Sequence, residues 1–448
     1  MSVLLATAFG VQFVSPLSGA NQGPDQCERW FQSGNTPEDS EDAAFRAVWR
    51  GYQILLDCYV DPPDGRRLLA AAWNNALRAA ATARAEPDEP LGEPDSDLAA
   101  IEARFESAMR HLMEQAGPGI APLELAQAAI SGMTLSLADN HTAFRRLDNY
   151  LDLQLPLSRQ RPDFGFSSIG VIGGSLVWEV QADGPAALAG IAVGDVIVSV
   201  RILSESGNGP TAVGVPMVLG VDRSGVGKIQ VRLIPRADEP SLESSLSPDG
   251  VARLRLRSFR ITAAQFLERY SSQLDAMEQG CPKGWVLDLR NNSGGRLDLA
   301  EIVAQKLGYA GRLILARPRY ASLPEVEPTP VRSITHYLPL VILVNGRSAS
   351  ASEVIAAALQ DAGMAYVVGT MTPGSVNLSR TFVVARGELS VTVARALVGP
   401  FQRNLDGVGV TPNETIEMDR RSLIEGRDPQ MERANRYILE SASRAEAC

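Results

Sequence analysis

Residues 340–353 read LVILVNGRSASASE, an apolar run followed by a turn of small residues. The apolar run predicts a buried strand, and the apolar residues at helical spacing after the turn predict a helix. A strand, a tight turn and a helix in this order can place a serine at a helix N-terminus, where unpaired N–H groups favour negative charge. Acyl-transfer enzymes use such a position, because a tetrahedral oxyanion must be stabilised beside the nucleophile. The same turn is also typical of a capping box, which only begins a helix.

A second stretch, residues 285–295, reads WVLDLRNNSGG and places another buried strand before a glycine pair. Together with the SASASE turn, and in this order, it resembles the C-terminal processing (tail-specific) serine peptidases. The resemblance implies that Ser350 is the nucleophile. It also implies that backbone N–H groups of Gly294, Gly295 and Ala351 form the oxyanion hole.

The chain departs from this family at the position of the base. Most members carry a lysine in a Gly-Lys-Gly turn, whereas residues 369–376 read GTMTPGSV and place Ser375 at the lysine position. The whole chain has only three lysines, which are Lys228, Lys283 and Lys306. Arginine does not replace lysine as a base, because it stays protonated in proteins. A Ser/Lys dyad is therefore not expected, and the alternative function is that of an inactive pseudo-peptidase that binds peptides.

Residues 137–144 read LADNHTAF and resemble the segment that supplies a histidine base in the tricorn-like branch of the same superfamily. A histidine within reach of a serine hydroxyl is a competent general base near neutral pH. The resemblance therefore gives His141 as the base. Asp406, which lies where that branch carries an acid, is the candidate for its third partner. Several lysine-dyad members also carry a histidine in this segment without using it as a base, so the pseudo-peptidase alternative stays open.

Residues 161–237 consist of short strands between glycine turns. Within them, residues 184–197 read GPAALAGIAVGDVI, which resembles a PDZ domain. Such a domain adds an extended C-terminal peptide to a sheet edge and holds its carboxylate with backbone N–H groups. The resemblance gives Ser168, Ile169 and Gly170 as the candidate carboxylate-binding loop. The alternative is that the domain only packs on the peptidase core or gates it.

The remaining chain divides by its hydrophobic pattern. Residues 23–160 predict a helical N-terminal unit, and residues 419–448 predict a peripheral helical tail. In residues 248–418, strands alternate with helices, which predicts an α/β peptidase core with a mostly parallel sheet. The nucleophile and the oxyanion donors then lie at carboxyl ends of strands, where open sheets bind ligands. Arg290 is interpreted as a member of a buried pair with Asp288 or a neighbour rather than as a substrate anchor.

The N-terminus and the cysteines indicate where the protein works. Residues 1–22 hold an apolar run and then small residues, which resembles a signal peptide; an unstructured start is the alternative, since the positive n-region is missing. We therefore expect an exported protein, periplasmic or extracellular. Cys27 and Cys58 are candidates for a disulfide, although the four cysteines allow three full pairings.

Composition limits the partners. The formal net charge of −10 does not indicate a nucleic acid or an anionic membrane. The sequence has neither metal-ligand spacing nor a phosphate-binding glycine loop, so no metal or cofactor is expected. The apolar N-terminal run is too short to span a bilayer, so no stable membrane insertion is expected. The expected substrates are proteins or peptides with free, unstructured C-termini.

Overall fold

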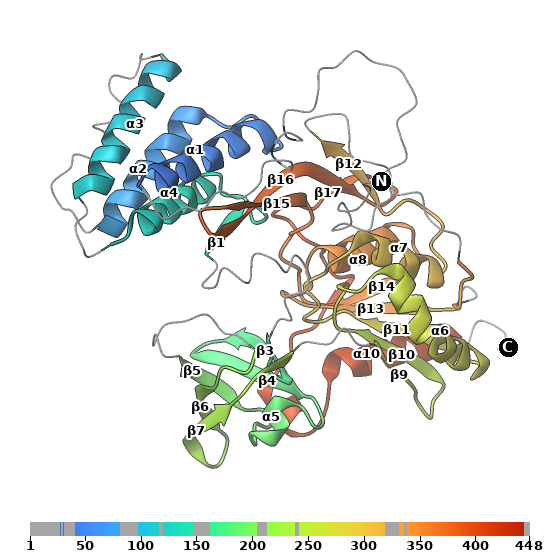
Figure 1. The fold of residues 1–448 in the computed structure, drawn as a ribbon. Helices are drawn as coiled ribbons and strands as arrows, with labels where there is room; N and C mark the ends of the chain where they lie inside the picture. Colours follow the sequence, from blue (N-terminus) through green and yellow to red (C-terminus); the bar gives the residue numbers. More distant parts are fainter. Residues whose placement is uncertain are drawn as a thin grey trace, which may run out of the picture. The chain divides into compact units, whose positions relative to one another are not determined.

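The computed structural model describes residues 27, 30, 41–80, 97–115, 120–146, 162–203, 213–237, 242–318, 331–335 and 338–442. The chain forms two compact units, each made of segments that are far apart in the sequence (Figure 1). Unit 1 comprises Met1–Leu157, Ile314–Val326 and Ser375–Leu397, and unit 2 comprises Ser158–Leu313, Glu327–Gly374 and Val398–Cys448. The predicted signal peptide of residues 1–22 lies outside the described residues.

Unit 1 combines helices with a sheet built around strand β16 (Gly387–Val398). Its helices are α1 (Glu41–Cys58), α2 (Gly65–Ala80), α3 (Leu98–Gln115) and α4 (Pro122–Ser136). Strand β16 pairs with β1 (Ala143–Arg146), β12 (Ile314–Pro318) and β15 (Leu378–Val384). No described helix is both long enough and apolar enough to cross a membrane.

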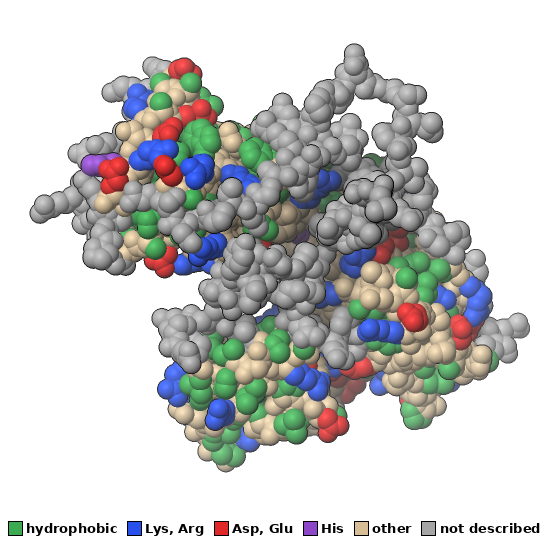
Figure 2. Space-filling view, in the orientation of Figure 1, with side chains coloured by type: hydrophobic (Ala, Val, Ile, Leu, Met, Phe, Trp, Pro, Cys, Tyr) green, Lys and Arg blue, Asp and Glu red, His purple; other side chains and the backbone are tan. Residues whose placement is uncertain are grey.

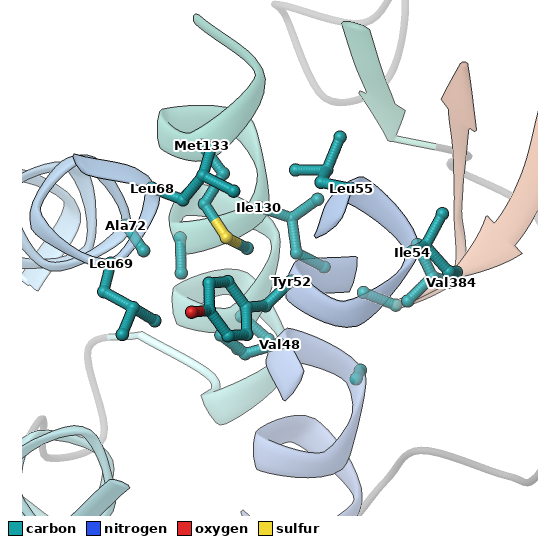
Figure 3. Packing of buried hydrophobic residues seen from close by; sticks show 14 of the residues in the cluster. Val48, Tyr52, Ile54, Leu55, Leu68, Leu69, Ala72, Ile130, Met133 and Val384 are labelled. Carbon is teal, nitrogen blue, oxygen red and sulfur yellow. The ribbon is translucent and has the colours of Figure 1, made fainter. Parts of the chain in front are cut away.

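The core of unit 1 lies where helices α1, α2 and α4 meet. Apolar residues at helical spacing give α1 and α2 one apolar face each, whereas α4 is buried around most of its surface, and these surfaces bury one another. Figure 3 shows the side chains that meet there, among them Val48, Tyr52, Ile54, Leu55, Leu68, Leu69, Ala72, Ile130 and Met133. Val384 of β15 belongs to the same cluster, so the sheet closes this core.

A disulfide joins Cys27 to Cys58 at the end of α1. Both cysteines are buried, at 4% and 1% exposure. The predicted pairing is confirmed. Cys448 lies outside the described residues.

The large sheet of unit 2 has six strands in the order β18-β14-β13-β11-β10-β9. They are β9 (Leu242–Leu246), β10 (Val251–Leu256), β11 (Gly284–Asp288), β13 (Leu340–Val344), β14 (Tyr366–Gly369) and β18 (Glu414–Thr415). Neighbouring strands run parallel, except that β9 is antiparallel to β10. Every residue of β11 and β13 is buried, as in parallel strands that are covered on both faces.

Helices cover both faces of the large sheet. They are α6 (Ala263–Gln279), α7 (Leu297–Lys306), α8 (Ala351–Asp361) and α10 (Pro429–Ala442). Figure 1 shows α7 and α8 on the side opposite α10. Ala434 and Ile438 of α10 are fully buried against Val286, Val341 and Leu343. The prediction of a peripheral tail was therefore wrong, because a narrow apolar stripe on a polar helix does not reveal how deeply it is buried.

The second sheet of unit 2, called here the small sheet, is antiparallel in the order β3-β4-β5-β6-β7. Its strands are β3 (Phe166–Val171), β4 (Gly174–Val180), β5 (Val196–Ile202), β6 (Met217–Arg223) and β7 (Gly227–Leu233). Helix α5 (Pro185–Leu188) contributes Ala186 to its inner cluster, and β2 (Pro162–Asp163) pairs with β8 (Arg236–Ala237) beside it. Its other face carries Leu176 and Trp178, which cluster with Met418 and Leu423 around α9 (Arg420–Ile424).

Ser168, Ile169 and Gly170 lie within strand β3, where they pair with β4. The prediction of a loop at these residues was wrong. The chain turns only at Ile172 and Gly173, so the backbone stays extended through the preceding residues. Strand β3 is last in the sheet order, which leaves one of its edges without a partner strand in the described sheet.

Candidate active site

The serine turn, residues 345–350, connects strand β13 to helix α8 and carries the first two of three closely spaced serines. The outer two serines of the three have structural roles. The Ser348 hydroxyl donates to the carbonyl of Leu289 at 2.8 Å, and the Ser352 hydroxyl donates to the carbonyl of Asn292 at 2.8 Å. Both side chains are fully buried. These two hydroxyls therefore fasten the turn rather than face a substrate.

Ser350, between them, is different. Its backbone adopts φ +56° and ψ −119°, a conformation that residues other than glycine rarely adopt. Its side chain is half-buried, and its hydroxyl makes no capping hydrogen bond to the helix that follows. Such strain costs about 1–3 kcal/mol and persists where the surroundings enforce it. We call this strained strand-to-helix turn the elbow; the nucleophilic serine of α/β-hydrolases lies on a turn of this kind.

The glycine turn, residues 289–295, packs directly on the serine turn. A Cβ on Gly294 would lie 2.7 Å from Ser350 Cβ and 2.8 Å from the Ala351 nitrogen, and Gly294 has φ +85°. Only glycine fits this approach. The Gly294 N–H donates to Asn292 Oδ1 at 2.9 Å, so it is already engaged. Ala351 and Gly295 are the other two predicted oxyanion donors: a Cβ on Gly294 would contact the Ala351 nitrogen, whereas a Cβ on Gly295 would meet the backbone of Phe259.

Glu353 joins the serine turn to residues 372–374. It is fully buried, and its Oε2 accepts the Ser350 N–H at 3.0 Å, which is one half of the predicted capping box. Its Oε1 accepts the Thr372 hydroxyl and the Gly374 N–H, each at 2.6 Å. From the sequence, this glutamate was expected only to cap the helix. The capping pattern itself was visible, whereas the contact with residues 372–374 depends on tertiary packing.

Asp406 lies in a turn against the same loop. The Gly407 N–H donates to the Gly374 carbonyl at 2.8 Å, and the Val410 N–H donates to the Thr372 hydroxyl at 2.7 Å. Glu353 therefore connects the elbow to a loop that in turn holds the Asp406 turn. Asp406 itself is half-buried.

Whereas Ser350 belongs to unit 2, His141 belongs to unit 1. Within unit 1 its position is fixed. Asp139 accepts the His141 N–H at 2.9 Å and the Thr142 hydroxyl at 2.7 Å, and the Thr142 hydroxyl accepts the Thr392 N–H at 3.0 Å. The Nδ1 atom of His141 is buried without a hydrogen-bond partner among the described residues. Ser375, at the position of the family lysine, also falls in unit 1.

The three lysines lie at positions that do not serve Ser350. Lys228 is on β7 of the small sheet, and Lys283 precedes β11, at the strand end opposite to the one that Ser350 follows in β13. Lys306 ends the ten-residue helix α7, about 15 Å from its start next to the glycine turn. No group of three or more His, Cys, Asp or Glu side chains in the described part of the chain is arranged to hold a metal ion.

Arg290 forms the buried pair with Asp288 that is expected from the sequence. Its Nε and Nη2 donate to the two oxygens of Asp288 at 2.9 and 2.7 Å. Burial alone would raise the pKa of Asp288, but the Arg290 and Arg255 guanidinium groups outweigh it and hold this pKa below its ordinary value. The pair is therefore ionised at neutral pH.

A strained serine on a strand-to-helix turn, with a glycine turn packed against it, is typical of serine hydrolases. Residues 250–416 match the model of peptidase family S41. The carboxy-terminal-processing protease of Bartonella bacilliformis is 30% identical over 328 residues, which are 68% of this chain and 72% of that one. The carboxy-terminal processing protease CtpA of Bacillus subtilis is 28% identical over 56% of this chain and 55% of its own length.

Among solved structures, the photosystem II D1 C-terminal processing protease has a TM-score of 0.50 at 21% identity, covering 84% of this chain and 93% of that one. That similarity concerns the fold, with its mixed α/β content and helical N-terminal region. The chain belongs to peptidase family S41, the family of the carboxy-terminal processing serine peptidases. The predicted family is thereby confirmed.

Proposed function

We propose that the protein is a serine endopeptidase that cleaves unstructured protein C-termini through an acyl-enzyme on Ser350. The observation that carries the proposal is the contrast among the three closely spaced serines. Ser348 and Ser352 are buried and hydrogen-bonded, whereas Ser350 alone has the strained backbone and a hydroxyl that makes no capping bond. A capping serine would have no reason to adopt that conformation.

The proposed reaction uses Ser350, His141 and backbone N–H groups. The Ser350 Oγ attacks the carbonyl carbon of the scissile bond while its proton passes to Nε2 of His141. The N–H groups of Gly295 and Ala351 stabilise the oxyanion. The Gly294 N–H can join them only if its hydrogen bond to Asn292 Oδ1 breaks. The C–N bond then breaks as the proton moves to the leaving amine. Water attacks the resulting ester, which forms a new carboxylate and restores the serine hydroxyl.

His141 is proposed as the base because the chain offers no lysine near Ser350. The buried Nδ1 of His141 has no partner among the described residues, and a base of this kind needs an acceptor there to fix its tautomer. Asp406 is the proposed acceptor. It is half-buried and sits on the turn that packs against the loop bound by Glu353.

Substrate recognition is assigned to residues 161–237, which we interpret as a PDZ domain. Its strand β3 has an edge without a partner strand in the small sheet, and an extended peptide can pair there. Arg347 of the serine turn donates to the hydroxyl of Ser168 on β3 at 3.4 Å. A peptide added along Ser168, Ile169 and Gly170 would therefore begin next to the serine turn.

The proposed partners are proteins with free C-termini and not nucleic acids. On the face drawn in Figure 2, the acidic and basic side chains of the described residues are interspersed. The chain as a whole carries a net charge of −10. Export to the periplasm or the extracellular space is supported by the Cys27–Cys58 disulfide, since such bonds form and persist in oxidising compartments.

A fluorophosphonate probe tests the chemistry on wild type, Ser350→Ala and His141→Ala. We expect labelling that both substitutions abolish and that is lost at acidic pH, because a general base must be unprotonated to accept the serine proton. His111→Ala is the control, because that side chain is 66% exposed on α3. Labelling that survives His141→Ala removes His141 as base. A folded wild type that is never labelled favours the peptide-binding alternative.

A second assay separates chemistry from recognition. Peptides with a free C-terminal carboxylate should be cleaved faster than the same peptides with a C-terminal amide, because β-strand addition captures the carboxylate with backbone N–H groups. Equal rates for the two peptides would contradict C-terminal recognition without affecting the role of Ser350.

A further inference from the structure

The guanidinium group of Arg290 lies where three segments of unit 2 meet. Trp178, on strand β4 of the small sheet, covers it with the ring centroid 4.4 Å from the guanidinium carbon. Arg255 lies 5.2 Å from the same ring and pairs with Glu179, the next residue on β4. Trp178 is only 6% exposed, and cation–π contacts are strongest where water is excluded.

Protein groups occupy all the donors of Arg290. A guanidinium has five N–H groups. Asp288 accepts from Nε and Nη2, Asp428 accepts from Nη1 at 3.1 Å and forms an ion pair with Nη2 at 2.9 Å, and Gln430 accepts from Nη1 at 3.0 Å. No donor is left for a substrate carboxylate. Arg290 therefore holds protein segments together.

The backbone on both sides of Arg290 is bonded to the serine turn. The carbonyl of Leu289 accepts the Ser348 hydroxyl at 2.8 Å, and the N–H of Asn291 donates to Asn345 Oδ1 at 3.0 Å. The same glycine turn reaches Ser350 at Gly294. A shift of Arg290 would therefore move the glycine turn and, through these hydrogen bonds, the serine turn.

Two of the groups that fix Arg290 come from the C-terminal segment, residues 418–431. Asp428 and Gln430 bind the guanidinium, and Gln430 is 1% exposed with its amide donating to the Ile416 carbonyl at 2.7 Å. Met418 and Leu423 of the same segment pack on the face of the small sheet that carries Trp178. The match to family S41 ends at residue 416, so this segment lies beyond the matched region.

We infer that the C-terminal segment and Trp178 hold Arg290 and thereby position the glycine turn beside Ser350. Trp178 and Asp428 are positioning residues, because both act through Arg290. The catalytic consequence rests on the proposed role of Ser350. The physical consequence, a fixed glycine turn, can be measured separately.

The test compares Trp178→Leu, Trp178→Phe and Asp428→Asn in the full chain. The first readout is the fluorophosphonate labelling rate per folded molecule, with kcat and KM for a peptide. We expect Trp178→Leu and Asp428→Asn to lose about 10- to 100-fold in labelling and kcat with KM little changed, since small misplacements near a reacting group cost rates of this order. Trp178→Phe keeps the ring over Arg290 and removes an Nε1 that is buried without a partner among the described residues, so its rate should stay within about threefold.

The second readout is hydrogen exchange of the peptide that contains residues 289–295. Exchange should quicken by about tenfold or more in Trp178→Leu and Asp428→Asn, because the turn opens more often when its anchor is loose. Arg433→Ala is the matched control. Arg433 also lies on the C-terminal side, pairs with Glu414 at 2.8 Å and contacts the rings of Tyr366 and Tyr437 at 5.7 and 5.8 Å. The Arg433→Ala variant should have a lower unfolding free energy but an unchanged labelling rate and unchanged exchange at residues 289–295.

The outcomes are distinct. Slower labelling and faster exchange in Trp178→Leu support the inference, provided that Trp178→Phe and Arg433→Ala keep wild-type labelling and wild-type exchange. Wild-type labelling per folded molecule in Trp178→Leu overturns it and leaves the proposed function intact. If folded wild type is not labelled, the proposed function fails, and exchange alone decides: faster exchange supports the positioning role of Trp178, and unchanged exchange overturns it.

Discussion

Gly294→Ala should remove most of the activity while the protein still folds. The new Cβ would lie 2.6 Å from the Ala349 carbonyl oxygen, 2.7 Å from Ser350 Cβ and 2.8 Å from the Ala351 nitrogen. Carbon atoms pack at about 3.5 Å or more, so Ser350 Cβ must retreat by roughly 0.8 Å. In addition, Gly294 has φ +85°, a left-handed conformation that costs other residues about 1–2 kcal/mol.

The magnitude follows from these two effects. A displacement near 1 Å at a reacting group costs about 100-fold in rate. Backbone strain and overpacking together should lower the free energy of unfolding by about 2–5 kcal/mol. The assay is the second-order rate constant for fluorophosphonate labelling, corrected for the folded fraction from a urea denaturation curve.

Gly225→Ala is the matched control for backbone strain. Gly225 has φ +76° in the turn between β6 and β7, and no heavy atom lies within 4 Å of the place that an added Cβ would occupy. This variant should lose about 1–2 kcal/mol of unfolding free energy and keep the wild-type labelling rate. Wild-type labelling by folded Gly294→Ala would refute the packing argument. An equal loss of labelling in both variants would show that strain alone explains the effect.

Three further predictions concern stability. Reducing the Cys27–Cys58 disulfide, which spans 31 residues, should lower the unfolding free energy of unit 1 by about 3–4 kcal/mol, measured as helical circular dichroism against urea with and without reductant. Glu353→Gln should cost about 1–3 kcal/mol in the same assay and slow labelling, because one of its two acceptor oxygens becomes a donor. The pKa of Asp288 is held below its ordinary value, so its ion pair with Arg290 stabilises the fold above about pH 4 and is lost as the pH falls further. The difference in unfolding free energy between wild type and Asp288→Asn should therefore be largest at pH 7 and should shrink near pH 3. A gap that stays constant over this range would contradict the ion-pair argument.

Local signals in the sequence predicted the elements around the elbow well. The apolar run before the SASASE turn is β13, and the helix after it is α8. The buried pair of Arg290 with Asp288 also follows from sequence, since two opposite charges at the end of a buried strand need each other. These features depend on residues that are close along the chain.

Features that depend on distant segments were missed. Asp428 and Trp178 reach Arg290 from two other parts of the chain, and neither carries a motif. Glu353 matched a capping box, but its contacts with Thr372 and Gly374 required the folded loop. The role of Ser350 was read from a resemblance, whereas its strained φ and ψ can only be seen in the folded chain.

The interleaving of the two units has a consequence for biosynthesis. The chain passes between the units five times, and Phe382, Val384, Leu389 and Val391 of β15 and β16 complete the core that begins with α1. During synthesis, the part of this core that the sheet covers must therefore wait for about 240 further residues, because β1 ends at Arg146 and β16 begins at Gly387. Contacts this distant in sequence form slowly, and apolar surface stays exposed until they form. A fragment that stops before residue 375 should accordingly aggregate or be captured by chaperones, even though it contains every residue of the four helices.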